Sequence, residues 1–472
     1  MTAIELQLLL RDAPLIASVQ ATAGSPVATP EALLLLAQAS LQEGVQLLRL
    51  EGKEAIRHIR DETRVPCIGL IKRPYEGSDV YITPTLVEVD ELIALGCEII
   101  ALDGTRRPRP GVDLATLVAR IHQAGRLAMA DCDDIASVHY ALASGCDLVG
   151  TTLAGYTSSA VATDGPDLEF LRAAVRESSV PVIAEGRYAT PGQAQVALRM
   201  GAAAVVVGGA LNDPIKQTRA FLAATQRPEA NVGAVDIGGT WIRFGVFSRD
   251  GELLSSDQVE TPLTREERED WIRDHVADSG VARLGVSSGG TIEPRSGIVT
   301  EAKDIILGHT GSRFTEREFG VPTVALNDGL ATAWGHACHP LFAGRRVATL
   351  ALGTGVGCGF VSDHRIWMGR HGEYTRLNDL SPLPGKSFED LLGGAALTAE
   401  PSFEDQQLAQ LAAVKAVRIL EAMYMPDVIV LCGGVGLSNW LGLGELSLVQ
   451  RSPYGAQAGL YGAAALALFA TV

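Results

Sequence analysis

The chain has 472 residues, too many for one hydrophobic core, so two or more domains are expected. Hydrophobic residues make up 47% and charged residues 20% of it, a composition typical of folded globular proteins and not of disordered chains. The net charge of −16 at pH 7 argues against nucleic acid and anionic membrane as partners, so any bound phosphate must meet a local basic or amide-lined site.

Cysteine usage and the N-terminal segment indicate the compartment. The start, MTAIELQLLLRD, lacks the basic region of a signal peptide, and no apolar run reaches membrane-spanning length. We therefore expect a soluble cytoplasmic protein. The odd number of scattered cysteines, with no CxxC pair, favours reduced thiols over a disulfide framework; they are Cys67, Cys97, Cys132, Cys146, Cys338, Cys358 and Cys432.

Residues 1–222 alternate short apolar strands with helical segments. Two of the helical segments, 83–96 and 190–201, begin with Thr-Pro and end on Gly, which are helix start and stop signals. Eight such strand–helix units predict a (β/α)8 TIM barrel, within the α/β class. The strands are expected at 15–20, 45–51, 66–72, 98–103, 126–132, 147–152, 181–186 and 204–209.

A polar segment that contains a proline, AATQRPEAN (223–231), is predicted to link the barrel to a second domain at 232–472. There the pattern changes. Residues 231–257 indicate consecutive hairpin strands with a turn at Asp250-Gly251. Later apolar strands end in glycine-rich turns and are mixed with helices, which indicates a second α/β domain.

Polar side chains stand at the carboxyl ends of the predicted barrel strands, where the chemistry of this fold is found. Groups of opposite charge gather there, which favours one functional pocket over separate structural ion pairs. The residues are Gln20, Arg49, Glu51, Lys72, Asp103, Asp131, Thr151, Thr152 and Glu185.

Lys72 ends an uncharged run, PCIGLIK, and has three interpretations. Desolvation at the barrel mouth favours the neutral amine, a usable base, and favours the acid form of Glu185. The pair would then move a proton off and onto a carbon next to a carbonyl, which is epimerisation. Lys72 could equally form a Schiff base, as aldolase lysines do, or a structural salt bridge to Asp103 or Asp131.

The loops after the last two strands suit a phosphate. EGRYATP and VGGALNDP follow strands seven and eight, whose loops often cradle phosphate in barrels. Their glycines allow close backbone approach. The expected phosphate-binding residues are Gly186, Arg187, Gly208 and Gly209.

The first half closely resembles N-acetylmannosamine-6-phosphate 2-epimerases, through IGLIKRPYEGSDVYITPT, ALDGTRRPRP, LAMADC, GTTLAGYT and PVIAEGRYATP. The resemblance runs from Leu15 to Leu211. It implies interconversion of N-acetylmannosamine 6-phosphate and N-acetylglucosamine 6-phosphate without a metal or organic cofactor. It assigns Lys72 as the base and Glu185 as the proton donor, with the sugar positioned by Gln20, Arg49 and Asp131.

Two glycine-rich turns in the second half suit a nucleotide. VDIGGTWIRFGVF places Asp236 near a strand end before Gly238, Gly239 and Thr240, and ALGTGVGCGF repeats the pattern. Such turns let backbone amides approach phosphates, and an Asp there can hold Mg²⁺ through water.

VALND ends a predicted strand on Asn327 and Asp328. A carboxylate at this point could take the proton from an attacking sugar hydroxyl. Alternatively Asp328 is only an N-cap, because a helical segment follows.

The order DxGGT, SSGGT, ND, GTGxGxG and GGVG resembles ROK-family sugar kinases, which have a two-lobed actin-like ATPase fold, over 232–470. The resemblance is greatest to N-acetylmannosamine kinases and implies ATP and Mg²⁺. It assigns Asp328 as the base for the sugar 6-hydroxyl. Its sugar-binding residues are Ser288, Gly289, Asn327, Glu373 and Glu389. Its nucleotide-binding residues are Asp236, Gly238, Gly239, Thr240, Gly353, Thr354, Gly355, Gly433 and Gly434.

The second half departs from many ROK kinases at their zinc site. Arg376 stands three residues after Glu373, where the family has a zinc-binding His, and the CxCGxxGC loop is missing. We expect that the structural zinc is absent and that packing of Phe388 and Leu391 holds the loop. HACHP (336–340) is more typical of core or surface than of a metal site.

Together the halves predict a bifunctional enzyme of amino-sugar or sialic acid catabolism with sugar and sugar-phosphate substrates, expected to be a homo-oligomer. Two alternatives remain for the second half. It could be a sugar-sensing regulator, although no DNA-binding helix-turn-helix precedes it. It could also be a catalytically weak sugar-binding or oligomerisation module.

Overall fold

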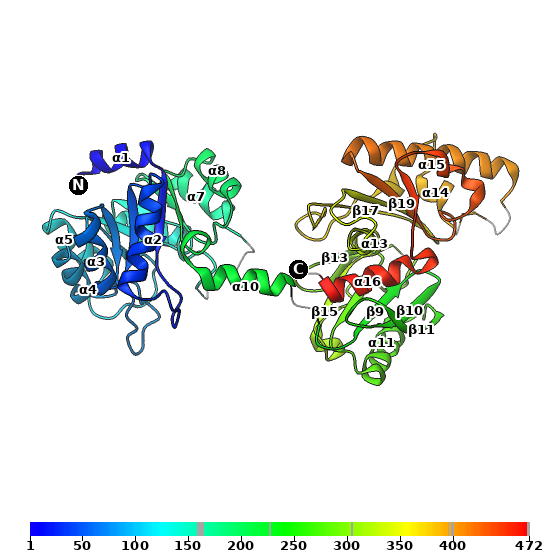
Figure 1. The fold of residues 1–472 in the computed structure, drawn as a ribbon, viewed down its shortest axis with the longest axis horizontal. Helices are drawn as coiled ribbons and strands as arrows, with labels where there is room; N and C mark the ends of the chain where they lie inside the picture. Colours follow the sequence, from blue (N-terminus) through cyan, green and yellow to red (C-terminus); the bar gives the residue numbers. More distant parts are fainter. Residues whose placement is uncertain (158–164, 226–227, 304, 395, 398–400, 470–472) are drawn as a thin grey trace. The chain divides into compact units, whose positions relative to one another are not determined.

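The computed structural model describes residues 1–157, 165–225, 228–303, 305–394, 396–397 and 401–469 (Figure 1). The chain folds into two compact units, Met1–Leu222 and Ala223–Val472. Helix α10 (Pro214–Thr225) continues into the first three residues of the segment expected as a linker, and Gln226 and Arg227 of that segment lie outside the described residues.

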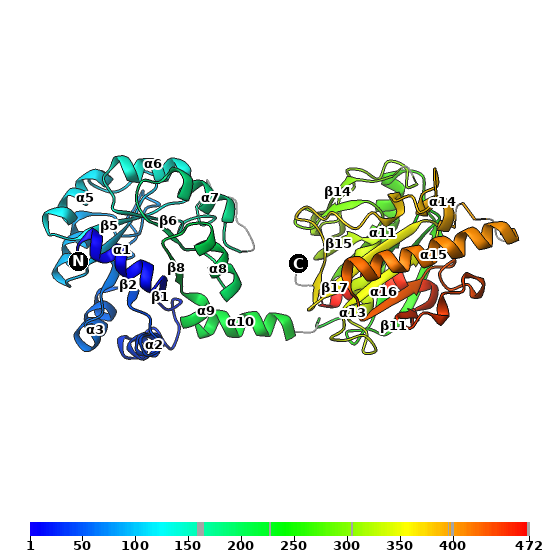
Figure 2. The ribbon, with the colours of Figure 1, turned by 90° about the horizontal axis from the view of Figure 1, so that it is seen from above.

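Eight parallel strands close the first unit into a barrel in the order β1 to β8, with β1 pairing to β8. This confirms the predicted TIM barrel, and Figure 2 shows its helices arranged around the ring of strands. The strands are β1 (Leu15–Val19), β2 (Leu47–Glu51), β3 (Cys67–Leu70), β4 (Ile99–Asp103), β5 (Leu127–Asp131), β6 (Leu148–Gly150), β7 (Val182–Ala184) and β8 (Ala204–Val207).

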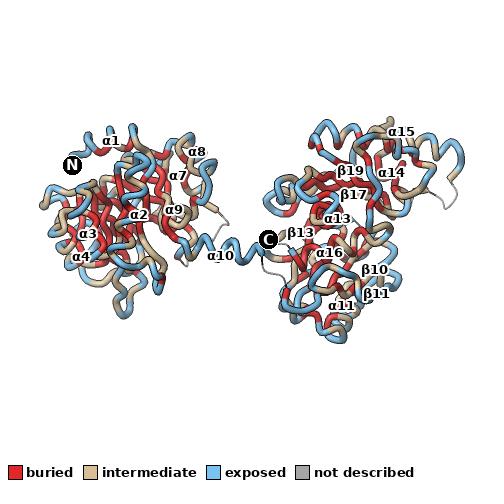
Figure 3. The backbone as a smooth tube through the Cα atoms, in the orientation of Figure 1, coloured by how far each residue is buried: buried red, intermediate tan, exposed pale blue. Residues whose placement is uncertain are grey.

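Two apolar layers hold the barrel together. One lies between the strands and the outer helices, and the other fills the barrel, where Leu6 and Leu10 of α1 (Ala3–Asp12) join it. Figure 3 shows the buried residues concentrated on the strands. The outer helices are α2 (Pro30–Gln42), α3 (Lys53–Thr63), α4 (Leu86–Ala94), α5 (Leu114–Gln123), α6 (Ile135–Ala143), α7 (Leu168–Glu177) and α8 (Pro191–Arg199); α9 (Gly209–Asn212) precedes α10.

The third strand ends earlier than its apolar run predicted. β3 stops at Leu70, and Lys72 instead pairs with Ile82 in an isolated bridge. The Thr83 amide donates to the Ile71 carbonyl (2.8 Å), so the chain from 71 to 83 folds back on itself. Lys72 therefore stands at the base of a loop above the barrel, not inside a barrel strand.

The second unit contains two five-stranded sheets, ordered β11-β10-β9-β12-β15 and β18-β17-β16-β19-β20. We call the first sheet with the β13–β14 hairpin the first lobe, and the second sheet the second lobe. The predicted hairpins at its start are present, since β10 pairs antiparallel with β9 and β11. The strands are β9 (Val232–Ile237), β10 (Trp241–Phe247), β11 (Leu253–Glu260), β12 (Leu284–Ser288), β13 (Thr291–Glu293), β14 (Ile298–Glu301), β15 (Thr323–Asn327), β16 (Val347–Leu352), β17 (Val356–Ser362), β18 (Arg365–Ile366), β19 (Val428–Cys432) and β20 (Val449–Arg451).

Helices α13 (Asp328–Ala337) and α16 (Ala458–Phe469) pack against each other at two glycines. A Cβ atom at Gly335 would lie 2.8 Å from the Gly462 Cα, so only glycine permits this approach. Asp328 is the first residue of α13. The remaining helices are α11 (Arg265–Ser279), α12 (Glu316–Phe319), η1 (Leu377–Asp379), α14 (Phe388–Leu392), α15 (Phe403–Tyr424), η2 (Asn439–Leu441), η3 (Leu443–Glu445) and η4 (Gly455–Gln457).

Among the helices in the described ranges, none combines the length and apolar character needed to cross a membrane.

Candidate active sites

A cavity of about 830 Å³ opens at the carboxyl ends of the barrel strands. It brings together most of the polar residues that the sequence predicts there. The predicted residues that line it are Gln20, Arg49, Lys72, Thr152, Glu185, Gly186, Arg187, Gly208 and Gly209.

Lys72 and Glu185 therefore share one cavity. The Lys72 Nζ donates to Gln20 Oε1 (2.8 Å), and Gln20 in turn donates to Ser18 Oγ (2.9 Å). Lys72 is exposed to the open cavity, yet protein surrounds its amine, and this desolvation lowers its pKa while the carboxylate of Glu51 opposes the shift. The amine is thus favoured as a base.

Beneath the cavity lies a buried charge cluster. Arg49 Nη2 donates to Asp131 Oδ2 (2.6 Å), and Arg49 Nε lies 3.1 Å from Glu185 Oε1. The Arg49 and Asp131 side chains are 2% and 0% exposed. Asp131 does not line the cavity itself but lies under Arg49. Asp103 pairs with Arg107 (2.6 Å), so the two aspartates proposed as salt-bridge partners of Lys72 are both matched with arginines.

Burial raises the pKa of Glu185 to about 7. Desolvation is the largest cause, Arg49 opposes it, and the nearby Asp131 carboxylate adds to the rise. Glu185 is therefore near its midpoint at neutral pH, with its acid form well populated, as a proton donor to carbon requires.

The far end of the cavity has the predicted glycine turns. Gly186 (φ 108°) and Arg187 (φ 59°) adopt left-handed backbone conformations directly after β7. Arg187 donates to the Ala154 carbonyl (2.8 Å) and stacks over the Tyr156 ring. Lys216 of α10 also lines this end. A phosphate here would meet basic side chains and open backbone.

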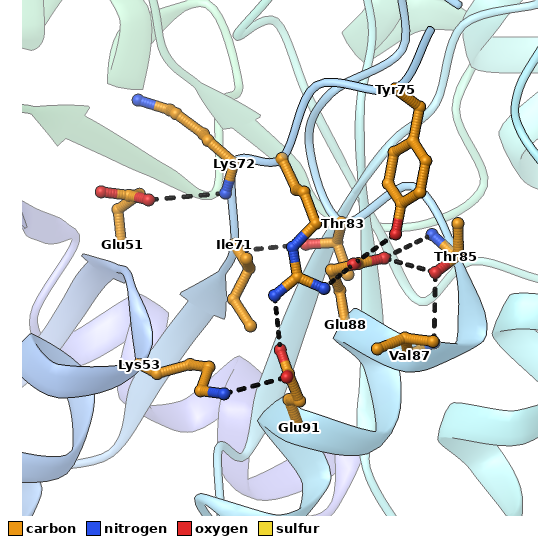
Figure 4. A network of polar contacts seen from close by, with 11 residues as sticks. Glu51, Lys53, Ile71, Lys72, Tyr75, Thr83, Thr85, Val87, Glu88 and Glu91 are labelled. Atoms are coloured by element: carbon orange, nitrogen blue, oxygen red, sulfur yellow. Dashed lines mark hydrogen bonds and ion pairs between the residues drawn. The ribbon is translucent and has the colours of Figure 1, made fainter.

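A polar network anchors the loop that carries Lys72 (Figure 4). The Arg73 guanidinium binds Glu88 and also Glu91 (3.2 Å), which accepts from Lys53 (2.9 Å). The buried Glu88 also caps α4 through Thr85 (2.9 Å). Figure 4 shows the Lys72 side chain extending away from Glu51, whose carboxylate accepts from the Lys72 backbone amide (3.4 Å).

A second cavity, of about 950 Å³, is lined by residues of both lobes in the second unit. It collects most of the predicted kinase-type residues. Those that line it are Asp236, Gly238, Gly239, Thr240, Gly289, Asn327, Asp328, Gly353, Thr354, Gly355, Glu389, Gly433 and Gly434.

The two predicted phosphate turns face each other across this cavity. Thr240 and Thr354 bring their hydroxyls to 3.1 Å. In the first turn a Cβ atom at Gly239 would lie 2.4 Å from Ile305 Cγ2, whereas in the second turn a Cβ atom at Gly353 would have no atom within 4 Å. The bare backbone leaves room for a polyphosphate chain.

Asp328 begins α13 but is not its cap, because Asn327 occupies the N-cap position and accepts from the Gly329 amide (3.0 Å). Asp328 is exposed to the cavity, yet desolvation raises its pKa to about 6; the Gly329 amide opposes the rise, and the Asp236 carboxylate adds to it. Desolvation likewise raises the pKa of Asp236, against the ion pair with Arg243 (3.2 Å).

Two predicted sugar-binding residues do not line the cavity. Glu373 is exposed and folds back to accept from the His371 amide (2.8 Å), while its neighbour Tyr374 lines the cavity. Ser288 is fully buried and pairs with His309 Nε2 (2.7 Å). Desolvation lowers the pKa of His309 to about 4, so this histidine is neutral at pH 7.

Two ion pairs connect the lobes beside this cavity. The Arg376 guanidinium binds both oxygens of Glu301, which ends β14, and Lys303 Nζ lies 2.7 Å from Asp379 Oδ1 of η1. Arg376 also lies over the ring of cavity-lining Tyr374. We call these four charged residues the clasp. Phe388 and Leu391, expected to hold the adjacent loop, lie in the second lobe's core.

No group of three or more His, Cys, Asp or Glu in the described part of the chain is arranged to hold a metal ion.

Several cavity residues were missed by sequence reasoning. In the barrel these include Tyr81, Tyr156, Asp213 and Lys216; in the second unit they include Lys303, Tyr374 and Asn378. Most of them come from loops, whose side-chain directions no strand or helix period specifies; Asn378 lies in η1 and Lys216 in α10. The proximity of Tyr374 to Glu373 was the one available signal.

The comparisons with known proteins divide the chain in the same way. Residues 33–227 match the NanE family, described as "Putative N-acetylmannosamine-6-phosphate epimerase", and residues 232–377 match the ROK family. The chain thus joins a NanE-type barrel to a ROK-type domain.

Full-length similarity is more specific. A bifunctional enzyme NanE/NanK of Brucella melitensis is 33% identical over 501 aligned residues, which cover 96% of this chain and 96% of that protein. The chain belongs to this bifunctional NanE/NanK family.

Solved structures resemble each half separately. The N-acetylmannosamine-6-phosphate 2-epimerase from Clostridium perfringens is 40% identical, over 46% of this chain and 95% of that one, with a TM-score of 0.45. A ROK family glucokinase from Streptomyces griseus, in complex with glucose and AMPPNP, is 23% identical. The match covers 50% of this chain and 99% of that one, with a TM-score of 0.44.

Proposed function

We propose that the chain catalyses two consecutive reactions. The second unit transfers a phosphoryl group from ATP to the 6-hydroxyl of N-acetylmannosamine, and the barrel converts the product into N-acetylglucosamine 6-phosphate. The observation that carries this pairing is the alignment to a bifunctional NanE/NanK enzyme along 96% of both chains. The kinase product is the epimerase substrate, so one chain would supply both steps of an amino-sugar catabolic route.

In the barrel, Lys72 takes the hydrogen from C2 of the open-chain sugar, next to the C1 carbonyl. The electrons of the broken C–H bond move into the adjacent carbonyl, and Glu185 returns a proton to C2 from the opposite face. The lowered pKa of Lys72 and the raised pKa of Glu185 support these roles. Gln20, Arg49 and Asp131 orient the sugar and the catalytic groups.

The sugar phosphate would be held by the turns after β7 and β8. Gly186, Gly208 and Gly209 offer backbone amides, and Arg187 and Lys216 supply positive charge at the same end of the cavity. A phosphate held there would keep the rest of the sugar in the cavity that Lys72 and Glu185 also line.

In the second unit, Asp328 accepts the proton of the sugar 6-hydroxyl as the oxygen attacks phosphorus. With a pKa of about 6, its carboxylate form predominates at neutral pH. Asn327, Gly289 and Glu389 line the same cavity and would bind the sugar. The turns around Gly239 and Gly353 would bind the phosphates of ATP through backbone amides, with Gly433 and Gly434 at the adenosine.

Asp236 is the residue placed to hold Mg²⁺, through water. A Mg²⁺ ion commonly uses one or two carboxylates together with substrate phosphates, and the single carboxylate at the phosphate turn fits that arrangement. When bound, the ion would neutralise charge on the phosphates.

A coupled assay of ATP consumption tests the kinase half. With N-acetylmannosamine, N-acetylglucosamine and glucose offered separately, we expect the highest kcat/KM for N-acetylmannosamine. Asp328→Asn should abolish sugar-dependent ATP consumption while epimerisation continues. An unchanged rate in that variant would show that the second unit works without this base, or is only a binding module.

A further inference from the structure

The hydroxyl of Thr152, which lies two residues beyond β6, is within hydrogen-bond distance of two acidic side chains. Thr152 Oγ1 is 2.7 Å from Asp131 Oδ1 and 3.0 Å from Glu185 Oε2. A hydroxyl has one hydrogen to donate and lone pairs to accept with. It can therefore donate to only one of the two carboxyl groups at a time.

The Thr152 hydroxyl should donate preferentially to Asp131. Asp131 is fully buried, its other oxygen accepts from Arg49, and it makes the shorter contact with Thr152. If Glu185 were also ionised, an oxygen lone pair of Thr152 would face a carboxylate oxygen with no hydrogen between them. The contact is satisfied when Glu185 is a carboxylic acid and donates to the hydroxyl.

We propose that Thr152 is a positioning residue whose hydroxyl serves both protonation states of Glu185, accepting from the acid and donating to the carboxylate. The inference rests on the proposed epimerase function. As the C2–H bond forms, the O–H bond of Glu185 breaks and its electron pair stays on the carboxylate. The Thr152 hydrogen then turns from Asp131 to Glu185 and is not itself transferred.

The other groups around Glu185 do not hydrogen-bond to its carboxyl group in the way that Thr152 does. The charged groups that face Glu185 are Arg49 on β2, Lys72 after β3 and Asp131 on β5. Arg49 Nε is close to Glu185 but makes no hydrogen bond. Within the described residues, Thr152 is the one hydrogen-bond partner of the Glu185 carboxyl group.

Removal of the hydroxyl should move the Glu185 titration downward. When Glu185 is an acid, the hydroxyl accepts from it and donates to the Asp131 carboxylate; when Glu185 is ionised, the hydroxyl makes only the bond to Glu185, so the acid form loses more stabilisation in Thr152→Val. The pKa of Glu185, raised by burial to about 7, should then fall by about 1 unit.

Thr151 provides a matched control. Its hydroxyl donates to the Glu185 carbonyl oxygen (2.8 Å) and accepts from the Glu185 amide (3.0 Å), so it holds the backbone of Glu185 but not its carboxyl group. Thr151→Val disturbs the same strand end without removing the partner of the acid.

Infrared spectroscopy of the full chain in a pH titration tests the proposal. The carbonyl band of the protonated acid is assigned by its loss in Glu185→Gln. We expect a midpoint near pH 7 in the wild type and in Thr152→Ser, and a midpoint about 1 unit lower in Thr152→Val. Thr152→Ala is the second hydroxyl-free variant if valine prevents folding, which circular dichroism checks.

An unchanged or higher midpoint in the hydroxyl-free variants would overturn the proposal, and so would an equal shift in Thr151→Val. The readout is the carboxyl group and not turnover. A wild-type protein that fails to epimerise its substrate would therefore refute the proposed function and leave the titration result standing.

Discussion

Lys72 is the residue whose surroundings decide the barrel chemistry. Its amine faces the cavity, donates to Gln20 and is not paired with Asp103 or Asp131, which bind arginines. Desolvation lowers its pKa, with Glu51 opposing. A base and not a structural cation is the role that these contacts favour.

We predict that Lys72→Ala abolishes exchange of the C2 hydrogen of N-acetylmannosamine 6-phosphate with deuterated solvent, because the variant lacks the amine proposed to remove it. Lys72→Arg keeps the positive charge but cannot act as a base at neutral pH, and should be equally inactive. Proton NMR measures the exchange. Undiminished exchange in either variant, or trapping of a substrate adduct on Lys72 by borohydride, would contradict the base role.

The kinase half should lose activity in acid. Asp328 works as a carboxylate, and its pKa is raised to about 6, so the active form is complete above this pH and falls about tenfold per unit below it. The pH profile of kcat for sugar-dependent ATP consumption measures this limb. A flat profile from pH 8 to about 5 would contradict the assignment of Asp328 as the base.

At the scale of elements, the position of strands was predictable and their ends were not. All eight barrel strands lie within the predicted ranges, because a buried parallel strand is an uninterrupted apolar run. The run PCIGLIK continues past the end of β3, since residues 71 and 72 are held by the returning loop at Ile82 and Thr83. Such nonlocal pairing has no signature in the run itself.

The candidate site residues show the same contrast between strand ends and loops. The positions of Lys72, Glu185 and Asp328 in the cavities were predictable from the sequence, because these residues stand next to strand ends and parallel strands converge at one edge. Glu373 is the counterexample. Its loop turns Glu373 to the surface and places Tyr374 in the cavity. The local backbone geometry determines which of the two side chains faces the cavity, and residue spacing in the sequence does not reveal it.

The clasp between β14 and η1 should affect sugar binding more than stability. Its side chains are between 43% and 62% exposed, and ion pairs this exposed contribute little to the free energy of unfolding, because water and salt screen them. We expect Arg376→Ala to raise the KM for the sugar several-fold, because Tyr374 loses its support and the lobes lose a contact. Steady-state kinetics at low salt measure the change.

The exchanged pair Glu301→Arg with Arg376→Glu is the matched control and should restore much of the sugar affinity. High salt should reduce the difference in the KM for the sugar between the wild type and Arg376→Ala, because salt screens the charges on the surface. A KM that is unchanged in Arg376→Ala at low salt would show that the clasp does not contribute to sugar binding.

At the scale of the whole molecule, the two compact units each carry a separate cavity with its own set of proposed catalytic groups. The change of pattern after residue 222 predicted this division from sequence. The end of α10 was not predictable from the polar segment, because Ala223, Ala224 and Thr225 are compatible with helix as well as with linker.

A mixture of two single-site variants tests the independence of the units. Lys72→Ala should retain the kinase and Asp328→Asn the epimerase, so neither alone converts N-acetylmannosamine into N-acetylglucosamine 6-phosphate. We expect the mixture to restore conversion, because the phosphorylated intermediate diffuses between molecules. Failure of the mixture, with both single activities intact, would mean that the intermediate does not pass through solution.

The central claim is that one chain phosphorylates N-acetylmannosamine and then inverts its C2 by proton transfer. Proton NMR of the wild-type chain with N-acetylmannosamine, ATP and Mg²⁺ in deuterated water tests it most directly. The account predicts N-acetylmannosamine 6-phosphate first, followed by N-acetylglucosamine 6-phosphate with deuterium at C2. Formation of the second product with its C2 hydrogen fully retained, or no phosphorylation at all, would contradict the account.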